Sequence, residues 1–399
     1  MSERYPIQRL RDLMRLDVRR ERIVEGTTYR LAGVLNAGQG VVDKGEFDGS
    51  GTEYATMNVL REGQVVMRKL TAWEGPIAVV PAEFDGFVVS GEFPTFTLGE
   101  GVAPAWFGLV CQSPRLWAEM KSRVVGTVQR RKRLNPGHLL EIEFPVPPLP
   151  VQERIVELIA AVDAQATALD TEAAAVDSVA GAIAESLLTE HELIPVGRHL
   201  VRTEAGRSPM ARNQTPLINE SGVLKVSAVT AFRFVPSESK ALLAETVLPE
   251  SLKVRAGDVL MTRASGSIDR VGAVCRVPNY VRDRLYLSDK TIRLVPEATL
   301  DADYLVVAMS LGSARRQIES AASGSASMKN ISQMKVAQIE IPVPGLDEQR
   351  RVVAAVMALR RSADANGAEA ERLRALRSSL LASLLNCEIE IKTAEELVA

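Results

Sequence analysis

The sequence contains few of the residues that build metal centres, disulfides or catalytic triads. Only three cysteines and three histidines occur among its 399 residues, and they are scattered along the chain. Cysteines without metal-ligand spacing are typical of proteins from a reducing cytosol. We therefore expect no metal site, no disulfide framework and a cytoplasmic location.

Long apolar runs are also missing. No stretch approaches the roughly 18 residues of a membrane span, and the opening MSERYPIQRL lacks the pattern of a secretory signal peptide. The length predicts two or three domains. Since 48 basic residues balance 50 acidic ones, any nucleic-acid surface must concentrate its positive charge locally.

Enzyme motifs are absent as well. Neither Gly-x-Gly-x-x-Gly nor Gly-x-x-x-x-Gly-Lys-Ser/Thr occurs, nor does the Asn/Asp-Pro-Pro-aromatic segment of amino-methyltransferases. Glu238-Ser239-Lys240 matches half of a nuclease signature, but no aspartate lies in the thirty residues before it. The sequence therefore predicts no catalytic residue and no cofactor.

The strongest positive signal is an internal repeat. The segment FPVPPLPVQERIV, which begins at Phe144, returns as IPVPGLDEQRRVV at Ile341, an offset of 197 residues. Residues 60–68, 78–80 and 88–90 likewise parallel 254–263, 273–275 and 286–288. The chain is therefore expected to be two copies of one fold, with loops of different length.

Each copy is predicted to contain a mixed domain followed by a long helix. Short apolar runs between Gly, Pro and Asp indicate strands at 64–67, 77–80, 259–261 and 273–277. One helical stretch is expected in each copy, at 105–123 and 303–321. The predicted fold class is α/β or α+β, with the domain duplicated.

From Leu149 onward the pattern becomes a heptad, in which apolar residues alternate steps of four and three. The predicted seam is Ile155, Ile159, Val162, Ala166, Leu169, Ala173, Val176, Ala180, Ile183 and Leu187. The equivalent seam of the second copy is Val352, Val356, Leu359, Ala363, Asn366, Ala370, Leu373, Arg377, Leu380 and Leu384. A core helix is the ordinary interpretation of such a stripe. Its length and duplicated register favour two antiparallel coiled-coil helices with pseudo-twofold symmetry.

The proline-rich segment that opens both long helices resembles the specificity subunit of type I restriction-modification systems. So does the Gly-Asp-Val-Leu-like strand followed by an arginine-containing loop. The resemblance covers essentially the whole chain, in the order domain, helix, domain, helix. The family pattern prefers Glu-Gln after the leucine. The second copy has Glu348-Gln349, whereas the first has Val151-Gln152-Glu153, a departure expected to weaken one partner contact.

The resemblance implies two target-recognition domains, at residues 1–148 and 192–345, each of which reads one half of a split double-stranded DNA sequence. It also implies spacer helices at 149–191 and 346–388, followed by a tail at 389–399. In this family the helices dock methyltransferase subunits, two of them here by expectation, and restriction (helicase-nuclease) subunits join through these. The subunit itself has no catalytic activity in the family.

Positive charge is concentrated shortly before the first long helix. Between Met120 and Leu140 there are six basic residues and no acidic ones. Uncompensated basic residues favour phosphate contacts, and glutamine is able to read an adenine edge. The ordinary alternative is a solvated face. The candidate DNA-binding residues of this segment are Gln129, Arg130, Arg131, Lys132 and Arg133.

Three other segments supply candidates for DNA contacts. Residues 323–330 are rich in Gly and Ser, so that their backbone is able to approach phosphates; Lys329 and Asn330 are the candidates there. Matching strand-to-loop segments follow the repeated strand in each copy, and arginine is the commonest reader of guanine. A surface loop or a core tryptophan is the alternative. Their candidates are Arg68, Lys69 and Trp73 in the first copy and Arg263, Ser265, Ser267 and Arg270 in the second.

Two functions of different class follow from these features. The favoured one is a DNA-reading subunit that directs a methyltransferase and a nuclease to their target. The alternative is a coiled-coil scaffold or adaptor without DNA specificity. A stand-alone nuclease ranks third, because the sequence lacks its motifs.

Overall fold

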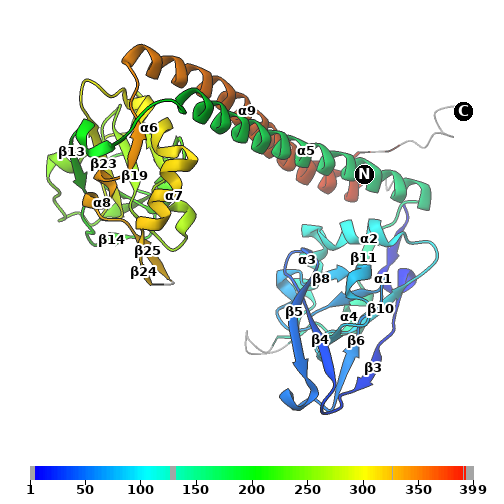
Figure 1. The fold of residues 1–399 in the computed structure, drawn as a ribbon. Coiled ribbons are helices and arrows are strands. Elements are labelled where there is room, and N and C mark those ends of the chain that lie inside the picture. Colours follow the sequence, from blue (N-terminus) through cyan, green and yellow to red (C-terminus); the bar gives the residue numbers. More distant parts are fainter. Residues whose placement is uncertain (1–4, 126–131, 326, 390, 392–399) are drawn as a thin grey trace, which may run out of the picture. The chain divides into compact units, whose positions relative to one another are not determined.

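The computed structural model describes residues 5–125, 132–325, 327–389 and 391 (Figure 1). Contacts divide the chain into two compact units, Met1–Leu169 with Ala368–Ala399 and Asp170–Gly367. Each unit therefore joins a globular domain to one half of each of two 40-residue helices, α5 (Leu149–Leu188) and α9 (Leu346–Leu385). In the described part of the chain, no helix combines the length and hydrophobicity needed to cross a membrane.

The first unit contains three sheets. A five-stranded sheet has the order β3-β6-β9-β4-β5, a four-stranded sheet has the order β2-β10-β7-β8, and β1 pairs with β11. The strands are β1 (Ile7–Arg9), β2 (Met14–Leu16), β3 (Arg19–Arg22), β4 (Thr28–Val34), β5 (Val41–Asp48), β6 (Thr56–Val59), β7 (Val65–Met67), β8 (Ile77–Val79), β9 (Val88–Val89), β10 (Thr95–Leu98) and β11 (Glu143–Pro145). The helices before α5 are α1 (Leu10–Leu13), α2 (Pro104–Cys111), α3 (Pro114–Ser122) and α4 (Pro136–Leu140).

The second unit repeats much of this plan. Its sheets have the orders β13-β23-β19-β21, β14-β18-β15-β22 and β20-β25-β24, with the pairs β12-β26 and β16-β17. The strands are β12 (Leu193–Pro195), β13 (Leu200–Ala205), β14 (Ala211–Arg212), β15 (Gly222–Leu224), β16 (Val229–Thr230), β17 (Arg233–Phe234), β18 (Ser239–Leu242), β19 (Val259–Thr262), β20 (Ala264–Ser265), β21 (Val274–Arg276), β22 (Leu285–Tyr286), β23 (Thr291–Pro296), β24 (Ser323–Ser325), β25 (Met328–Asn330) and β26 (Glu340–Pro342). The helices before α9 are α6 (Ala302–Ser310), α7 (Gly312–Ala321) and α8 (Gln333–Ala337).

Equivalent elements confirm the mixed fold class and the duplication. The sheet β2-β10-β7-β8 corresponds to β13-β23-β19-β21, and the pair β1-β11 corresponds to β12-β26. The prediction of one helix in each copy was wrong, because α2 and α3 are separate helices, as are α6 and α7. Pro114 begins α3, where its missing N–H does no harm. In the second copy the break lies at Leu311, whose backbone is extended.

Aromatic rings fill the core of the first unit and extend it onto the long helix. Trp106, Phe96 and Phe144 are almost fully buried, and the Trp106 and Phe144 rings meet edge to face with centroids 6.5 Å apart. Ile155 and Ile159 of α5 belong to the same cluster. The first turns of α5 are therefore part of the domain core.

A buried glutamine fixes the start of α5 to this domain. The Gln152 side chain is completely buried, and its Oε1 accepts a hydrogen bond from the Ala103 N–H at 2.9 Å. Its Nε2 donates to the carbonyl oxygens of Gly101 at 3.0 Å and Pro147 at 2.9 Å. An amide is suited to this place because it offers both an acceptor and two donors.

The second copy uses the same device at the start of α9. Gln349 is also fully buried; its Oε1 accepts from the Asp301 N–H at 2.8 Å, and its Nε2 donates to Thr299 O at 3.0 Å and Pro344 O at 2.8 Å. We call Gln152 and Gln349 the paired glutamines. They occupy the same position of the sequence repeat and make the same three bonds.

The departure from the family pattern lies one residue earlier, at Val151. This side chain is 4% exposed and joins the core of the first unit. Glu348 stands at the equivalent position of the second copy, where its carboxylate lies 3.0 Å from Nε2 of His191. The first copy therefore replaces a polar contact with apolar packing inside its own unit.

The two long helices pack together within each unit, as Figure 1 shows. In the first unit the early residues Ile155 and Ile159 share a cluster with the late residues Leu381 and Leu384. In the second unit the late residues of α5 share one with Val352 and Val356, which begin α9. Early residues of one helix thus meet late residues of the other, which confirms an antiparallel pair.

The predicted seam holds except at the end of α5. Ile183 and Leu187 are 36% and 50% exposed, whereas Ala184 and Leu188 are 1% and 4% exposed. These last two seam assignments were therefore wrong by one residue. The reason is geometric, since an α-helix has 3.6 residues per turn and drifts away from a strict repeat of 3.5.

Charged pairs replace apolar contacts at two places between the helices. In the first unit, Nε of Arg377 lies 2.6 Å from Oδ1 of Asp163. In the second, Nη1 of Arg360 lies 3.4 Å from Oδ1 of Asp177. Arg377, a polar exception on the predicted seam, thus has a partner on the opposite helix, which spares it the cost of an unpaired buried charge. The other exception, Asn366, has a buried Nδ2 with no hydrogen-bond partner among the described residues.

Replacing Gln152 by glutamate tests the importance of the buried amide. The Gln152→Glu side chain keeps its shape, but it cannot donate to Gly101 O and Pro147 O, and it places a charge in the core. We expect the free energy of unfolding to fall by about 3 kcal/mol, from two lost bonds and a buried carboxylate. Urea unfolding followed by tryptophan fluorescence measures this. The control is Gln214→Glu at an exposed position; equal midpoints for both variants would contradict the role.

Candidate nucleic-acid interface

In the first unit, the structure brings Lys69 and Arg133 together around one carboxylate. Nε and Nη2 of Arg133 lie 3.1 and 3.3 Å from the Glu92 oxygens, and Nζ of Lys69 lies 3.9 Å from Glu92 Oε1. The Leu134 N–H also donates to the Lys69 carbonyl at 3.1 Å. Two basic side chains with one acidic partner leave a net positive charge at this surface.

The Arg68 guanidinium is hydrogen-bonded to its own loop and to Asn36. Its Nε donates to Leu70 O at 3.1 Å, and its Nη2 donates to Asn36 Oδ1 at 2.8 Å and Thr71 Oγ1 at 2.6 Å. These bonds use the donors that would otherwise read guanine. Arg68 therefore positions the loop that carries Lys69. Trp73 lies half-buried in a 3-10 helix, Ala72–Glu74, of the same loop.

Of the remaining candidates of the first unit, the structure describes only Lys132. Lys132 is half-buried beside Arg133. Gln129, Arg130 and Arg131 lie outside the described residues. The prediction that this segment contacts DNA stays a prediction.

In the second unit, basic residues line a hollow of about 440 Å³. We call it the basic hollow. Strands β15, β18 and β20 and their flanking loops form its wall, and Ser265 and Gly266 lie on one side of it. Asp289 is its single acidic residue. Its basic residues are Arg207, Lys225, Lys240, Arg270 and Lys290.

Pairing of short strands carries several predicted residues to this hollow. Strand β20 pairs with β25, which sets Ser265 opposite Lys329 and Ala264 opposite Asn330. The Arg263 N–H donates to the Lys290 carbonyl at 2.9 Å. Ser265 and Arg270 line the hollow, whereas Lys329 and Asn330 lie on the strand beside it. The structure therefore brings most candidates of the second copy to one place.

The hollow includes cations that the sequence reasoning missed. Lys225, Lys240 and Lys290 come from separate segments, so no run of charge marks them in the sequence. Arg207 differs, because it belongs to the basic stretch of Arg198, Arg202, Arg207 and Arg212, which the sequence predicts to contact phosphates. Lys225 pairs with Glu238 at 3.7 Å. Among the described residues, Arg207, Lys240, Arg270 and Lys290 form no ion pair. Close cations without counter-charges create a local field that attracts a polyanion.

The partial nuclease signature has a different place in the structure. The Ser227 hydroxyl donates to Glu238 Oε2 at 2.5 Å, and this bond, with Lys225 nearby, lowers the pKa of the Glu238 carboxyl. Lys240, two residues on, lines the basic hollow. No cluster of three metal-binding side chains occurs within the described residues. The segment therefore contributes charge to the hollow.

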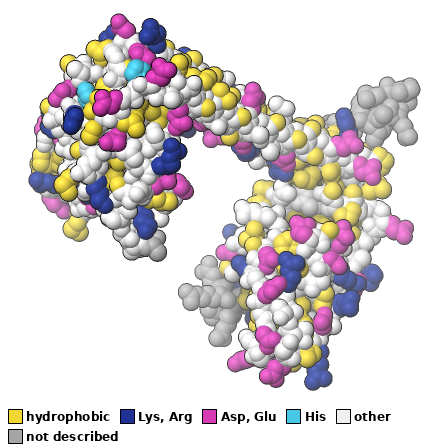
Figure 2. All heavy atoms as spheres, in the orientation of Figure 1, with side chains coloured by type: hydrophobic (Ala, Val, Ile, Leu, Met, Phe, Trp, Pro, Cys, Tyr) yellow, Lys and Arg dark blue, Asp and Glu magenta, His cyan; other side chains and the backbone are white. Residues whose placement is uncertain are grey.

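Charge over the rest of the surface is mixed. Figure 2 shows basic and acidic side chains interleaved over the visible face of both units, in keeping with the near-neutral total. The basic hollow is thus distinguished by local composition.

Comparison with known proteins found one similar curated sequence and several similar structures. A region of 165 residues, 40% of this chain, is 33% identical to the type I restriction enzyme EcoEI specificity subunit of Escherichia coli. The similarity to a type I specificity subunit is thus confined to this region of the chain. The match spans 27% of the Escherichia coli protein, well under its full length. A scan against protein-family models found no match.

Two solved structures resemble this chain over nearly its whole length. A chain from a study of complex assembly and conformational transition of the type I R-M system aligns over 96% of both chains, with 18% identity and a TM-score of 0.58. The HsdS subunit of Thermoanaerobacter tengcongensis aligns over 96% of this chain and 97% of its own, with 18% identity and a TM-score of 0.48. The first of these shares the fold of this chain over nearly its whole length.

Two arginines at equivalent loops should respond differently to removal. Arg68 holds its loop, so Arg68→Ala should lower the melting temperature by several degrees through the loss of three hydrogen bonds. Arg270 lines the basic hollow and is exposed, so Arg270→Ala should leave melting unchanged and weaken DNA binding by about tenfold. Calorimetry and DNA titration at fixed salt measure both effects. The reverse assignment of effects would contradict this distinction.

Proposed function

We propose that this chain is a non-catalytic DNA-recognition subunit of a type I restriction-modification complex. The observation that carries the proposal is the duplication: two equivalent domains, each fixed by a paired glutamine to the start of a long helix. A two-part reader needs two reading domains in a fixed register, and this construction supplies them. The proposed target-recognition domains are residues 1–148 and 192–345.

Recognition in the second domain would begin with phosphates. Five cations around the basic hollow would release counterions from the DNA backbone, which supplies sequence-independent affinity. The adjoining loops hold Ser267 and Arg270 in exposed positions, where they are able to reach base edges. In the first domain, Lys69 and Arg133 around Glu92 take the corresponding role.

The outer faces of the long helices support docking of methyltransferase subunits. In the second unit Val179 and Leu187 of α5 are each 50% exposed, and in the first unit Leu376 of α9 is 55% exposed. Apolar side chains on a charged helix face are typical of surfaces that a partner covers. Restriction subunits would join through that core complex in the cytoplasm.

A scaffold without DNA specificity is the competing function. It would also use the helices, but it gives no role to a hollow lined by five cations and one acid. Binding through several phosphates weakens steeply as salt rises. A DNA affinity of the purified complex that falls by orders of magnitude between about 50 and 200 mM salt would favour recognition over a scaffold.

Deletion of the gene tests the proposed function directly. Methylome sequencing of the host should show a split motif, two short specified parts around an unspecified gap, which disappears in the deletion strain and returns on complementation. Loss is expected because the methyltransferase would have no target reader. An unchanged methylome with no such motif would sink the proposal.

Lengthening the helices tests their role as a spacer. Four residues inserted after Leu169 and after Gly367 add one turn to each helix, or roughly 6 Å. At about 3.4 Å per base pair the unspecified gap should grow by one or two base pairs, with both half-sites unchanged. Methylome sequencing gives both quantities. Altered half-sites would contradict the spacer role.

A further inference from the structure

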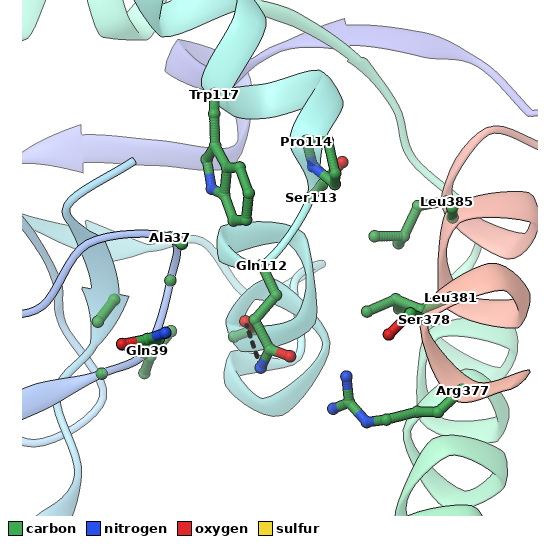
Figure 3. Close-up of a pocket in the computed structure, with 16 residues that line it drawn as sticks. Ala37, Gln39, Gln112, Ser113, Pro114, Trp117, Arg377, Ser378, Leu381 and Leu385 are labelled. Atoms are coloured by element: carbon green, nitrogen blue, oxygen red, sulfur yellow. Dashed lines mark hydrogen bonds between the residues drawn. The ribbon is translucent and has the colours of Figure 1, made fainter. Parts of the chain in front are cut away.

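The first unit contains a cavity of about 700 Å³ between its domain and the last turns of α9 (Figure 3). Its wall combines the turn between β4 and β5, the junction of α2 and α3, and the helix α9. Trp117, Ser113, Gln112, Arg377 and Leu381 line it. All of these elements belong to one compact unit, so the cavity is a feature of that unit alone.

The lining offers both an aromatic and a polar subsite. The Arg377 guanidinium reaches into the cavity (Figure 3), and its Nε is paired with Asp163. The Trp117 indole N–H is bonded to Cys111 O at 2.7 Å, so its ring contributes only surface. A ring stacked on a guanidinium gains cation–π attraction.

The polar subsite lies at the start of α3. The Ser113 side chain is 2% exposed and lines the cavity, and its hydroxyl has no hydrogen-bond partner among the described residues. The N–H groups of Arg115 and Leu116 likewise have no acceptor in the described structure. A hydroxyl without a partner at the start of a nine-residue helix favours a carboxylate.

The second copy shows how the chain itself fills the equivalent place with an aromatic ring. The connection between β15 and β18 runs over residues 225–238, whereas the equivalent connection between β4 and β5 has only residues 35–40. The longer connection carries Phe232, whose ring lies 3.7 Å from the Arg360 guanidinium. Arg360 is paired with Asp177 of the opposite helix, as Arg377 is with Asp163, although in the repeat Arg360 aligns with Asp163 and Arg377 aligns with Ala180.

The two connections share a local geometry. Phe232 and Ala37 both have left-handed backbone, with φ of 63° and 53°. Phe232 packs against the hydrophobic core of the second unit, whereas Ala37 lines the cavity of the first. The first copy therefore lacks the ring that closes this place in the second.

The second copy also supplies a carboxylate. Glu185 of α5 accepts a hydrogen bond from the N–H of Gly312, the first residue of α7, at 2.8 Å. The corresponding positions in the first copy are Ala382 of α9 and Pro114, which have neither carboxylate nor N–H. Both groups that occupy this place in the second copy are thus missing in the first.

We propose that the cavity receives a segment of a partner protein that places an aromatic side chain on Arg377 and a carboxylate at the start of α3. The occupant is peptide because the chain uses protein side chains, Phe232 and Glu185, at the equivalent place. The cavity is larger than one ring, so a segment of several residues fits. This site goes beyond the proposed function, since it requires no DNA, and it makes the two halves unequal.

Cross-linking in the complex purified from the host identifies the occupant. The photo-reactive residue p-benzoylphenylalanine replaces Gln39, which is exposed and lines the cavity, and replaces Ala55, which is exposed elsewhere in the unit, as a control. Irradiation should join position 39, but not position 55, to a peptide of a partner protein that contains an aromatic and an acidic residue. Cross-links to DNA, to this chain or to nothing from position 39 would overturn the proposal.

A variant whose own side chain fills the cavity provides a second test of the site, and it uses the full chain. Ala37→Phe supplies the ring that the second copy has, whereas Ala55→Phe adds a ring to the surface. The first variant should raise the melting temperature of the isolated chain, lower its affinity for the partner more than tenfold and abolish the cross-link. The second should change none of these. Wild-type partner affinity in Ala37→Phe would refute the site.

The two proposals fail separately. If the cross-link is absent while deletion of the gene still removes a split methylation motif, the cavity has no peptide occupant and DNA recognition stands. If the cross-link forms while the methylome is unchanged, the cavity has a peptide occupant and the proposed DNA recognition fails.

Discussion

The attachment of each domain to its long helix depends on one buried glutamine amide. A polar group removed from water must find hydrogen-bond partners inside the protein or lose several kcal/mol. The paired glutamines satisfy both ends of their side chains with backbone groups from the domain, at Gly101 and Ala103 in one copy and at Thr299 and Asp301 in the other. These hydrogen bonds fix the rotation of each domain about its long helix and the position of the domain along the helix axis. The proposed reading of two half-sites would require this fixed attachment, since any slip would change the register.

The sequence repeat predicted the positions of the domains and the long helices well, because these elements occur twice in the chain. The offset of 197 residues located both helix starts, and most of the predicted seam is buried or half-buried. The error at Ile183 and Leu187 arose because a strict heptad was extended further than a helix of 3.6 residues per turn allows. The glutamines were visible in the repeat, but their role was not, since their partners are backbone groups that only the folded chain brings near.

The candidate interface was less predictable, for a physical reason. Arg68 and Arg270 occupy equivalent loops, yet Asn36 and Thr71 bind one guanidinium while the other lines an open hollow. Whether an arginine is free depends on acceptors far away in sequence. The cations of the hollow come from several loops, each carrying little charge alone. The sequence therefore indicated only Arg207 and Arg270 among them, and the formal charge of −2 conceals the rest.

The two copies differ mainly where a substitution or an insertion disturbs few neighbouring elements. Residues that touch the glutamines or the helix pair are held by two elements at once, so a substitution there disturbs both. The connections 35–40 and 225–238 are held only at their ends, and they differ in length. That difference alone decides whether Phe232 closes a space on Arg360 or a cavity opens beside Arg377. A symmetric frame thus acquires unequal surfaces through its loops, as the proposed recognition of two unlike half-sites would require.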